Sequence, residues 1–267
     1  MHGFIIAAGP GSRMGSFTES RPKCLLPVAG RTLLENVISN FRRVGCTEIT
    51  VIVGHKAEMI RFPNVNYVLN SAYRDNNILH SLMKARDHLV GPVIVSYGDI
   101  WIEPWVLDKL LDTVGDIALA VDRDWLPYYE GRTKHPVSEA ENVFFDDSGL
   151  VVNIGKHLEP RLAAHLTCGE FTGLWRMTEV GTFWFTREFS RLDDGLSPNA
   201  RFQQAAQWRR AYITDIVQQL VDQGWPVNCA VIERGWAELD TEEDVQRLDV
   251  IAERQRLQTI VETGSLQ

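Results

Sequence analysis

The stretch IIAAGPGSRMG, from Ile5 to Gly15, has the pattern of a strand that breaks into a glycine-rich loop. Glycines at positions 9, 11 and 15 let the backbone turn tightly and direct several N–H groups toward one point, which suits a triphosphate. The stretch has no GK[ST] of a P-loop and is not a clean GxGxxG, so phosphate binding and a plain structural turn both remain open. Arg13 within the loop and Lys23 after it favour phosphate, because both can neutralise phosphate oxygens.

The composition is that of a globular, acidic protein. The chain has 267 residues, of which 45% are hydrophobic, and a formal net charge of −8 at pH 7. This length can bury one substantial core, and the negative charge argues against nucleic acid and anionic membranes as partners. The N-terminus has no signal-peptide pattern, and no apolar run reaches the roughly 18 residues of a membrane-spanning helix. We therefore expect a cytoplasmic protein that binds neither nucleic acid nor membranes.

Short apolar runs alternate with helical patterns along the chain, which is typical of a sheet covered by helices on both faces. The patterns predict strands at 3–8, 92–100, 116–122 and 227–232, and helices at 33–45, 180–192 and 213–223. NVFFDDSGLVVNIG is typical of a hairpin, whereas 123–135 is an irregular loop. We predict an α/β, Rossmann-like fold with a mixed, mostly parallel sheet flanked by helices. It forms a single domain over residues 1–250 with a small insertion, and 251–267 are the end of a C-terminal helix and a tail.

Two acidic motifs follow the glycine-rich segment along the chain. Asp99 ends a predicted buried strand in VSYGDIW, and ligand sites in open α/β sheets lie outside such strand ends, so this carboxylate can hold a divalent metal. A helix cap or a turn is the plain alternative. Glu238 and Asp240 precede a helix predicted to begin at Thr241, and Asp240 could serve only to stabilise that helix terminus.

The order of these motifs carries more information than each motif alone. AAGPGSRMG, RPKCLLPVAGRTLLE, YGDIW and WAELDTEED together resemble the sugar-phosphate, phosphocholine and phosphonate nucleotidyltransferases of the MobA-like NTP transferase fold. The resemblance extends from Gly3 to about Leu248. It implies an enzyme that joins a nucleoside triphosphate to a phosphorylated metabolite and releases pyrophosphate.

The resemblance also implies roles for individual residues. The triphosphate would be bound by the loop residues Ala8, Gly9, Gly11 and Ser12. Arg13 and Lys23 would be the catalytic cations, and Mg²⁺ would be held by Asp99 and Asp240, with Glu238 as a further candidate ligand. Pro10 departs from many members of the family and removes one N–H group from the loop.

The segment from Asn66 to Ala85 resembles the branch that acts on phosphocholine, inositol phosphate and small phosphonates. In that branch an NN pair and a following serine approach the nucleotide, and Asn77 and Ser81 are the matching positions. The branch commonly uses CTP, so we expect cytidylyl transfer. Helix N-capping by Asn76 and Asn77 is the plain alternative.

Acceptor-binding segments are expected within about residues 122–180. GKH at 155–157 resembles the position whose lysine meets the acceptor's phosphoryl group, which is Lys156 here. Segments resembling those of phosphonate cytidylyltransferases supply the other candidates: Asp122, Trp125, Tyr129, Arg132 and Glu170. Aromatic rings and carboxylates could cage an ammonium group, whereas Arg132, Lys134 and His135 could hold a second acid group, and the sequence leaves both open.

Taken together, the sequence predicts a Mg²⁺-dependent cytidylyltransferase that transfers CMP from CTP to a small phosphonate or phosphate monoester. A sugar-1-phosphate nucleotidyltransferase is the first alternative. A non-catalytic nucleotide-binding regulator is the second, although such a protein would have no chemical need for the metal carboxylates. The apolar stripe of the C-terminal helix is compatible with a homodimer.

Overall fold

Strands and helices alternate along the chain in the computed structural model, which describes residues 1–28, 30–156, 158, 165–245 and 247. The main strands are β1 (His2–Ala7), β4 (Glu48–Val53), β5 (Asn66–Leu69), β6 (Val93–Tyr97), β8 (Ile117–Asp122), β9 (Glu141–Phe145), β10 (Val151–Lys156), β11 (Thr167–Met177) and β12 (Val227–Ile232). Two short pairs join β2 (Pro27–Val28) to β3 (Arg31–Thr32) and β7 (Ile100–Ile102) to β13 (Trp236–Glu238). The α-helices are α1 (Leu33–Arg43), α2 (Ile78–Leu82), α3 (Pro104–Asp112), α4 (Glu179–Gly195) and α5 (Ile213–Asp222).

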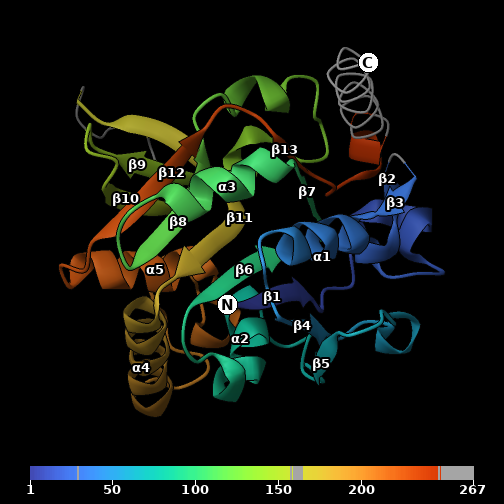
Figure 1. Ribbon diagram of the computed structural model, residues 1–267, viewed down its shortest axis with the longest axis horizontal. Helices are drawn as coiled ribbons and strands as arrows, with labels where there is room; N and C mark the ends of the chain where they lie inside the picture. The colour runs from blue at the N-terminus through green and yellow to red at the C-terminus, as the bar shows by residue number, and fades with distance from the viewer. Residues whose placement is uncertain (29, 157, 159–164, 246, 248–267) are drawn as a thin grey trace.

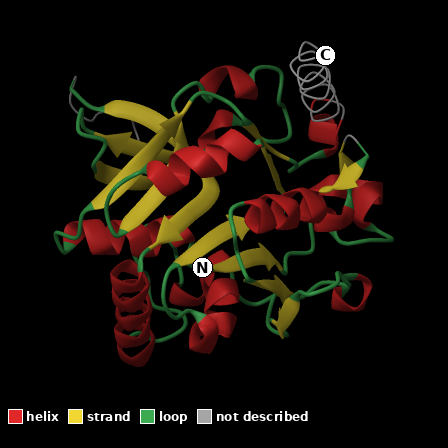
Figure 2. Cartoon of the chain, viewed as in Figure 1, coloured by secondary structure: helices red, strands yellow, loops and turns green. Residues whose placement is uncertain are grey.

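The main strands form one mixed sheet. In its first half β5, β4, β1 and β6 lie side by side and run parallel. The long strand β11 then pairs antiparallel with β6, β8 and β9, so it joins the parallel half to the rest of the sheet. Helices α1 and α3 lie in front of the sheet and α5 behind it (Figures 1 and 2). The predicted α/β fold with a mixed sheet flanked by helices is therefore confirmed.

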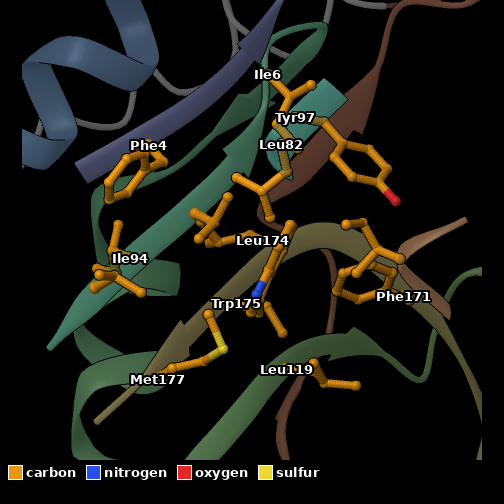
Figure 3. Close-up of a cluster of buried hydrophobic side chains, with 14 of the residues drawn as sticks. Phe4, Ile6, Leu82, Ile94, Tyr97, Leu119, Phe171, Leu174, Trp175 and Met177 are labelled. Carbon is orange, nitrogen blue, oxygen red and sulfur yellow. The ribbon is translucent and has the colours of Figure 1, made fainter. Parts of the chain in front are cut away.

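The core is continuous across both halves of the sheet because β11 contributes side chains to each. Trp175 and Leu174 on β11 are fully buried and belong to the same cluster as Phe4 on β1 and Leu119 on β8. Figure 3 shows these side chains converging from neighbouring strands. One continuous core explains why residues from distant parts of the sequence can hold fixed positions at the edge of the sheet.

Local sequence signals account for the ends of several elements. Helix α1 begins with a capping box, in which Thr32 accepts from the Glu35 backbone and the Glu35 side chain accepts from the Thr32 backbone. The predicted hairpin is β9 and β10, and the Asp146 carboxylate closes its turn by accepting from the backbone of Ser148 and Leu150.

The described part of the chain contains no helix that is both long and apolar enough to cross a membrane. Of the predicted C-terminal helix, residues 242–245 and 247 are described as helical. The segment 251–267, and most of the apolar stripe on which the homodimer expectation rests, lie outside the described residues.

Candidate active site

The glycine-rich loop leaves the end of β1 and enters a short 3-10 helix at Ser12–Thr18. Gly11 has φ 61°, and a Cβ at this position would lie 3.0 Å from the Cβ of Lys23, so the turn requires glycine. The loop is anchored by Met14, which is fully buried in a small cluster with Leu26 and Leu239. This anchor holds the loop against the segment that carries Asp240.

Four charged residues that the sequence singled out meet at the loop. The Lys23 ammonium lies 2.7 Å from Asp99 Oδ2 and 2.5 Å from Asp240 Oδ1. The Arg13 guanidinium lies 2.7 Å from Asp240 Oδ2. Asp99 follows β6 and Asp240 follows β13, so the fold brings two strand ends to the glycine-rich loop. The position of Asp99 agrees with the ligand position expected for open α/β sheets, whereas Asp240 comes from the separate β7–β13 pair.

The ion pairs set the charge state of this cluster. Burial works against a charged lysine, but Asp240 and Asp99 outweigh it and raise the pKa of Lys23. Burial likewise disfavours the charged form of Asp240, yet Lys23, His135 and Arg13 hold the pKa of Asp240 well below its usual value. Lys23 is therefore cationic and Asp240 anionic near neutral pH.

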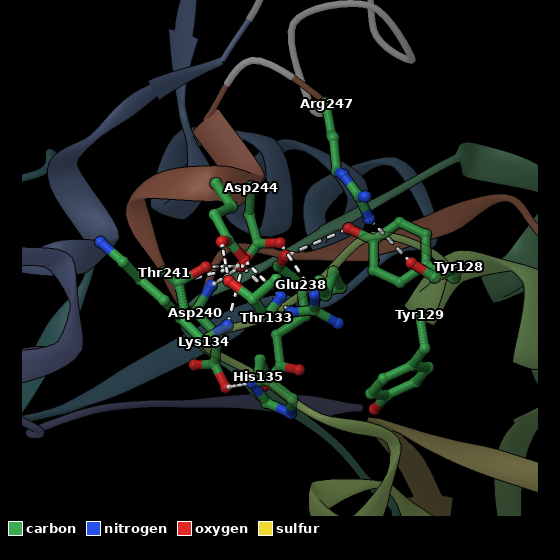
Figure 4. Close-up of polar contacts among 12 residues, drawn as sticks. Tyr128, Tyr129, Thr133, Lys134, His135, Glu238, Asp240, Thr241, Asp244 and Arg247 are labelled. Atoms are coloured by element: carbon green, nitrogen blue, oxygen red, sulfur yellow. Dashed lines mark hydrogen bonds and ion pairs between the residues drawn. The ribbon is translucent and has the colours of Figure 1, made fainter.

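His135 and Glu238 complete the cluster around Asp240 (Figure 4). His135 Nδ1 lies 2.7 Å from Asp240 Oδ2, and both side chains are almost fully buried. Burial, then Asp240 and Asp99, raise the pKa of Glu238 well above its usual value. His135, Glu238 and Asp240 each offer one ligand atom within 4.8 Å of the others. No sequence pattern indicated that His135 joins this group, because the histidine comes from the irregular 123–135 loop.

Two adjoining cavities open on the cluster. The first is bordered by the loop at Gly9, Gly11, Ser12 and Arg13 and extends to Lys156 and Glu170. The second is bordered by Ala8, Gly9, Asn77 and Ser81, and Arg210 lines it as well. Gly9, Asn77 and Asp99 line both cavities. Asp99 therefore stands where two ligands bound in the two cavities would meet.

Asn77 and Ser81 line the second cavity as polar residues at the start of α2. The Asn77 amide donates to the Arg210 carbonyl at 3.0 Å, and Ser81 Oγ donates to the Asn77 carbonyl at 3.1 Å. Asn77 is at the N-cap position, but its side chain makes no capping hydrogen bond, and the Asn76 amide pairs with Asn70 instead. The side-chain capping role considered for this pair is therefore wrong.

Lys156 and Glu170 are the predicted acceptor residues that line the first cavity. Lys156 Nζ lies 4.9 Å from the ring centre of Tyr212 and 3.6 Å from Glu139 Oε2. Glu170 is 3% exposed, and its Oε1 accepts a hydrogen bond from the Tyr129 hydroxyl. Sequence reasoning missed four neighbours that also line this cavity: Tyr97, Glu141, Tyr212 and Trp236.

Four other predicted acceptor residues do not line either cavity in the described part of the chain: Asp122, Trp125, Tyr129 and Arg132. The expectation that they contact the acceptor directly is therefore corrected. The Asp122 carboxylate accepts from Trp236 Nε1 at 2.9 Å. Arg132 Nε lies 2.9 Å from Asp244 Oδ1 in a fully buried pair. Tyr129 holds Glu170, and the Trp125 ring packs edge-on against Tyr129. These side chains build the wall behind the cavity.

Comparisons with known proteins find cytidylyltransferases among the similar chains. A CTP:phosphoglutamine cytidylyltransferase of Campylobacter jejuni is 24% identical over 92% of this chain and 98% of that protein. A CMP-5'-(3-aminopropyl)phosphonate synthase of Streptomyces rubellomurinus is 35% identical, over 46% of this chain and only 21% of that longer protein. The solved CTP:phosphocholine cytidylyltransferase of Streptococcus pneumoniae superposes with a TM-score of 0.68 at 18% identity, over 94% of this chain and 98% of that one.

The match to a family covers the glycine-rich loop, Asp99 and the first acceptor segments. Residues 3–165 match the MobA-like NTP transferase domain. The sequence resemblance is thereby confirmed, and the chain belongs to the MobA-like NTP transferase family of nucleotidyltransferases.

Proposed function

We propose that this protein is a cytidylyltransferase that transfers CMP from CTP to a small phosphonate or phosphate monoester and releases pyrophosphate. The observation that carries the proposal is the pair of adjoining cavities that share Asp99: the first extends from the glycine-rich loop to Lys156, and the second lies beside Asn77 and Ser81. The choice of CTP and of a small phosphorylated acceptor is supported by the relatives, a CTP:phosphoglutamine cytidylyltransferase and a CMP-5'-(3-aminopropyl)phosphonate synthase.

The reaction needs no enzyme nucleophile. An anionic oxygen of the acceptor attacks the α-phosphorus of CTP in line, the new P–O bond forms, and the bond to pyrophosphate breaks. Because the attacking group is already an anion, the barrier comes mainly from repulsion between the two substrates and from the need to align them. Lys23 and Arg13 stand beside Asp99 and Asp240, where their charges can offset that repulsion.

The residues present fit a divalent cation. Carboxylate oxygens are the ligands that Mg²⁺ prefers, and Asp99 and Asp240 both face the Lys23 ammonium. Burial, with repulsion from Asp240 and Asp99, raises the pKa of Glu238, so this side chain lies close to the other two carboxylates in a buried cluster. Asp99 and Asp240, with Glu238, would therefore hold Mg²⁺, which when bound would neutralise phosphate charge.

Pyrophosphate release tests the proposal. The purified protein is incubated with Mg²⁺ and each of five nucleoside triphosphates, against phosphocholine, aminoalkyl-, hydroxyalkyl- and carboxylated phosphonates and sugar 1-phosphates. We expect release with CTP and a phosphonate or phosphate monoester, and its loss in Asp99→Asn. Asp108→Asn is the matched control, because Asp108 is an exposed carboxylate on α3 that pairs with Arg43.

Two other results would contradict the proposal. Release only with a sugar 1-phosphate would identify a sugar-1-phosphate nucleotidyltransferase with the same chemistry. Binding of CTP without pyrophosphate release across the whole panel would indicate a non-catalytic regulator.

A further inference from the structure

The inner part of the first cavity is acidic. Glu141 on β9, Glu170 on β11 and Glu238 on β13 all line it. Glu170 is 3% exposed. Burial raises the pKa of Glu170 to about 8, and Asp122 and Glu141 contribute to this rise. Carboxyl groups from three strands therefore line one space.

Glu170 also has an oxygen that the protein leaves without a donor. Its Oε1 accepts from the Tyr129 hydroxyl, whereas the buried Oε2 has no hydrogen-bond partner among the described residues. Leaving a buried acceptor without a donor costs free energy. In native proteins such a group is often explained by a bound ligand or an ordered water. A ligand that brings an N–H group to Oε2 would remove this cost.

The basic residues expected to bind a second acid group of the acceptor substrate are already paired with carboxylates. Arg132 pairs with Asp244, Lys134 Nζ lies 3.0 Å from Glu242, and His135 lies against Asp240. A carboxylated phosphonate would have to break one of these pairs and would also meet the glutamates of the cavity. Its tail therefore does not match this pocket.

A quaternary ammonium group would bring positive charge to the pocket. It would not donate a hydrogen bond to Glu170 Oε2, because trimethylammonium has no N–H group. The ring of Tyr212, which lines the cavity, is already covered by the Lys156 ammonium at 4.9 Å. A primary ammonium supplies both the positive charge and the hydrogen-bond donors.

We propose that the acceptor is a small phosphonate or phosphate monoester with a primary ammonium group, which donates a hydrogen bond to Glu170 Oε2. This inference rests on the proposed function and names the acceptor class for it. Glu170 is then the residue that determines specificity, and Tyr129 is a positioning residue that fixes the Glu170 carboxylate through Oε1.

Asn142 provides a check within the chain. It lies directly across from Glu170 in the β9–β11 ladder, and its Nδ2 also has no partner among the described residues. Side chains of directly opposed residues lie on the same face of a sheet, so this amide is an alternative partner for Glu170. If Asn142, and not a ligand, were the partner of Glu170 Oε2, Asn142→Ala would change the surroundings of Glu170. The preference for an ammonium group would then change as well.

The experiment compares acceptors of equal size. Initial rates with CTP are measured for 2-aminoethylphosphonate, 2-hydroxyethylphosphonate, the N,N,N-trimethyl derivative of the amine and phosphonoacetate, and then for the three-carbon amine and alcohol. Isothermal titration with the same probes gives affinity without turnover. Wild type is compared with Glu170→Gln, Asn142→Ala and the surface control Glu233→Gln, whose side chain is exposed and pairs with Arg123.

We expect the amine to exceed the equally long alcohol by about 10- to 100-fold in kcat/KM and in affinity, the range for a charge-assisted hydrogen bond. Glu170→Gln should remove most of this preference and leave the KM for CTP unchanged, while Asn142→Ala and Glu233→Gln keep the preference. The wild-type ratios remain decisive even if Glu170→Gln fails to fold.

Other outcomes separate the two proposals. Turnover in which the alcohol, the trimethyl derivative or phosphonoacetate equals the amine would overturn the inference and leave the cytidylyltransferase proposal intact. Loss of the preference in Asn142→Ala would also overturn it. Preferential binding of the amine with no pyrophosphate release from any acceptor would support the ammonium site and contradict the proposed function.

Discussion

Replacement of Arg132 by methionine should destabilise the fold rather than remove an acceptor contact. The Arg132 and Asp244 side chains are 1% and 0% exposed, and Arg132 Nε lies 2.9 Å from Asp244 Oδ1. Removing one partner of a buried ion pair costs about 3–5 kcal/mol because the other charge is left buried. Asp244 Oδ2 keeps three donors, from the Asp240 backbone and from the backbone and hydroxyl of Thr241, so we expect a cost near the lower limit, about 3 kcal/mol.

Urea unfolding at pH 7 measures this cost as the difference in the free energy of unfolding between wild type and Arg132→Met. The control is Arg123→Met, because Arg123 pairs with Glu233 at the surface, where both side chains are more than half exposed and such a pair contributes about 0–1 kcal/mol. A loss of under about 0.5 kcal/mol in Arg132→Met, combined with a raised KM for the acceptor, would refute this reasoning and return Arg132 to the acceptor site.

Three further predictions concern the site. Lys23→Ala should lower kcat/KM by about 10²–10³-fold, the cost of removing one preorganised cation from a site of developing charge, as measured by pyrophosphate release. Unchanged turnover would exclude Lys23 from catalysis. Gly11→Ala should weaken CTP binding in titration calorimetry, because Gly11 has φ 61° and the added Cβ would lie 3.0 Å from the Lys23 Cβ; wild-type affinity would show that the loop adapts. The affinity for 2-aminoethylphosphonate should rise from pH 6 to about 8, because Glu170 has a pKa of about 8 in the free protein and must lose its proton to bind an ammonium group. Tyr129, Arg132, Asp122 and Glu141 surround Glu170 and contribute to this pKa, so the rise should be absent in Glu170→Gln, and an identical rise in that variant would assign it to another group.

The nucleotide side of the site could be predicted because its signals are local. Gly11 and Lys23 lie in one short segment after the first strand, and Asp99 comes two residues after β6, whereas Asp240 was expected only from its place before a helix. Positions at strand ends can be placed from the strand pattern alone, since neighbouring strands of a sheet end at a common edge. The structure indeed brings these carboxylates to the same lysine.

The acceptor side was less predictable because it depends on the path of the irregular loop at 123–135. Arg132 is a charged residue in a polar segment, and no local pattern shows that it pairs with Asp244 from the other end of the chain. Asp122 is likewise used within the fold by Trp236, which forms part of the short strand β13. A charged residue in a buried ion pair and a charged residue that binds a ligand look alike in the sequence. Only their tertiary contacts distinguish them.

Glu141 is a residue of the opposite kind, because it lines the cavity although no sequence signal predicted it. It begins a strand after a polar segment, where a glutamate usually faces solvent, yet it lies in the cavity and accepts a hydrogen bond from the Tyr97 hydroxyl at 3.1 Å. Its burial follows from the pairing of β9 with the first part of β11, whose later residues pair with β6, and strand propensity does not encode this pairing.

The most direct test of the central claim is to follow the α-phosphorus of CTP. CTP labelled at that phosphorus is incubated with the protein, Mg²⁺ and 2-aminoethylphosphonate, and the products are resolved by chromatography and ³¹P NMR. The account predicts that the label appears in a phosphoanhydride between CMP and the phosphonate, with one pyrophosphate released for each. Label found only in CMP, or remaining in CTP across the acceptor panel, would contradict it.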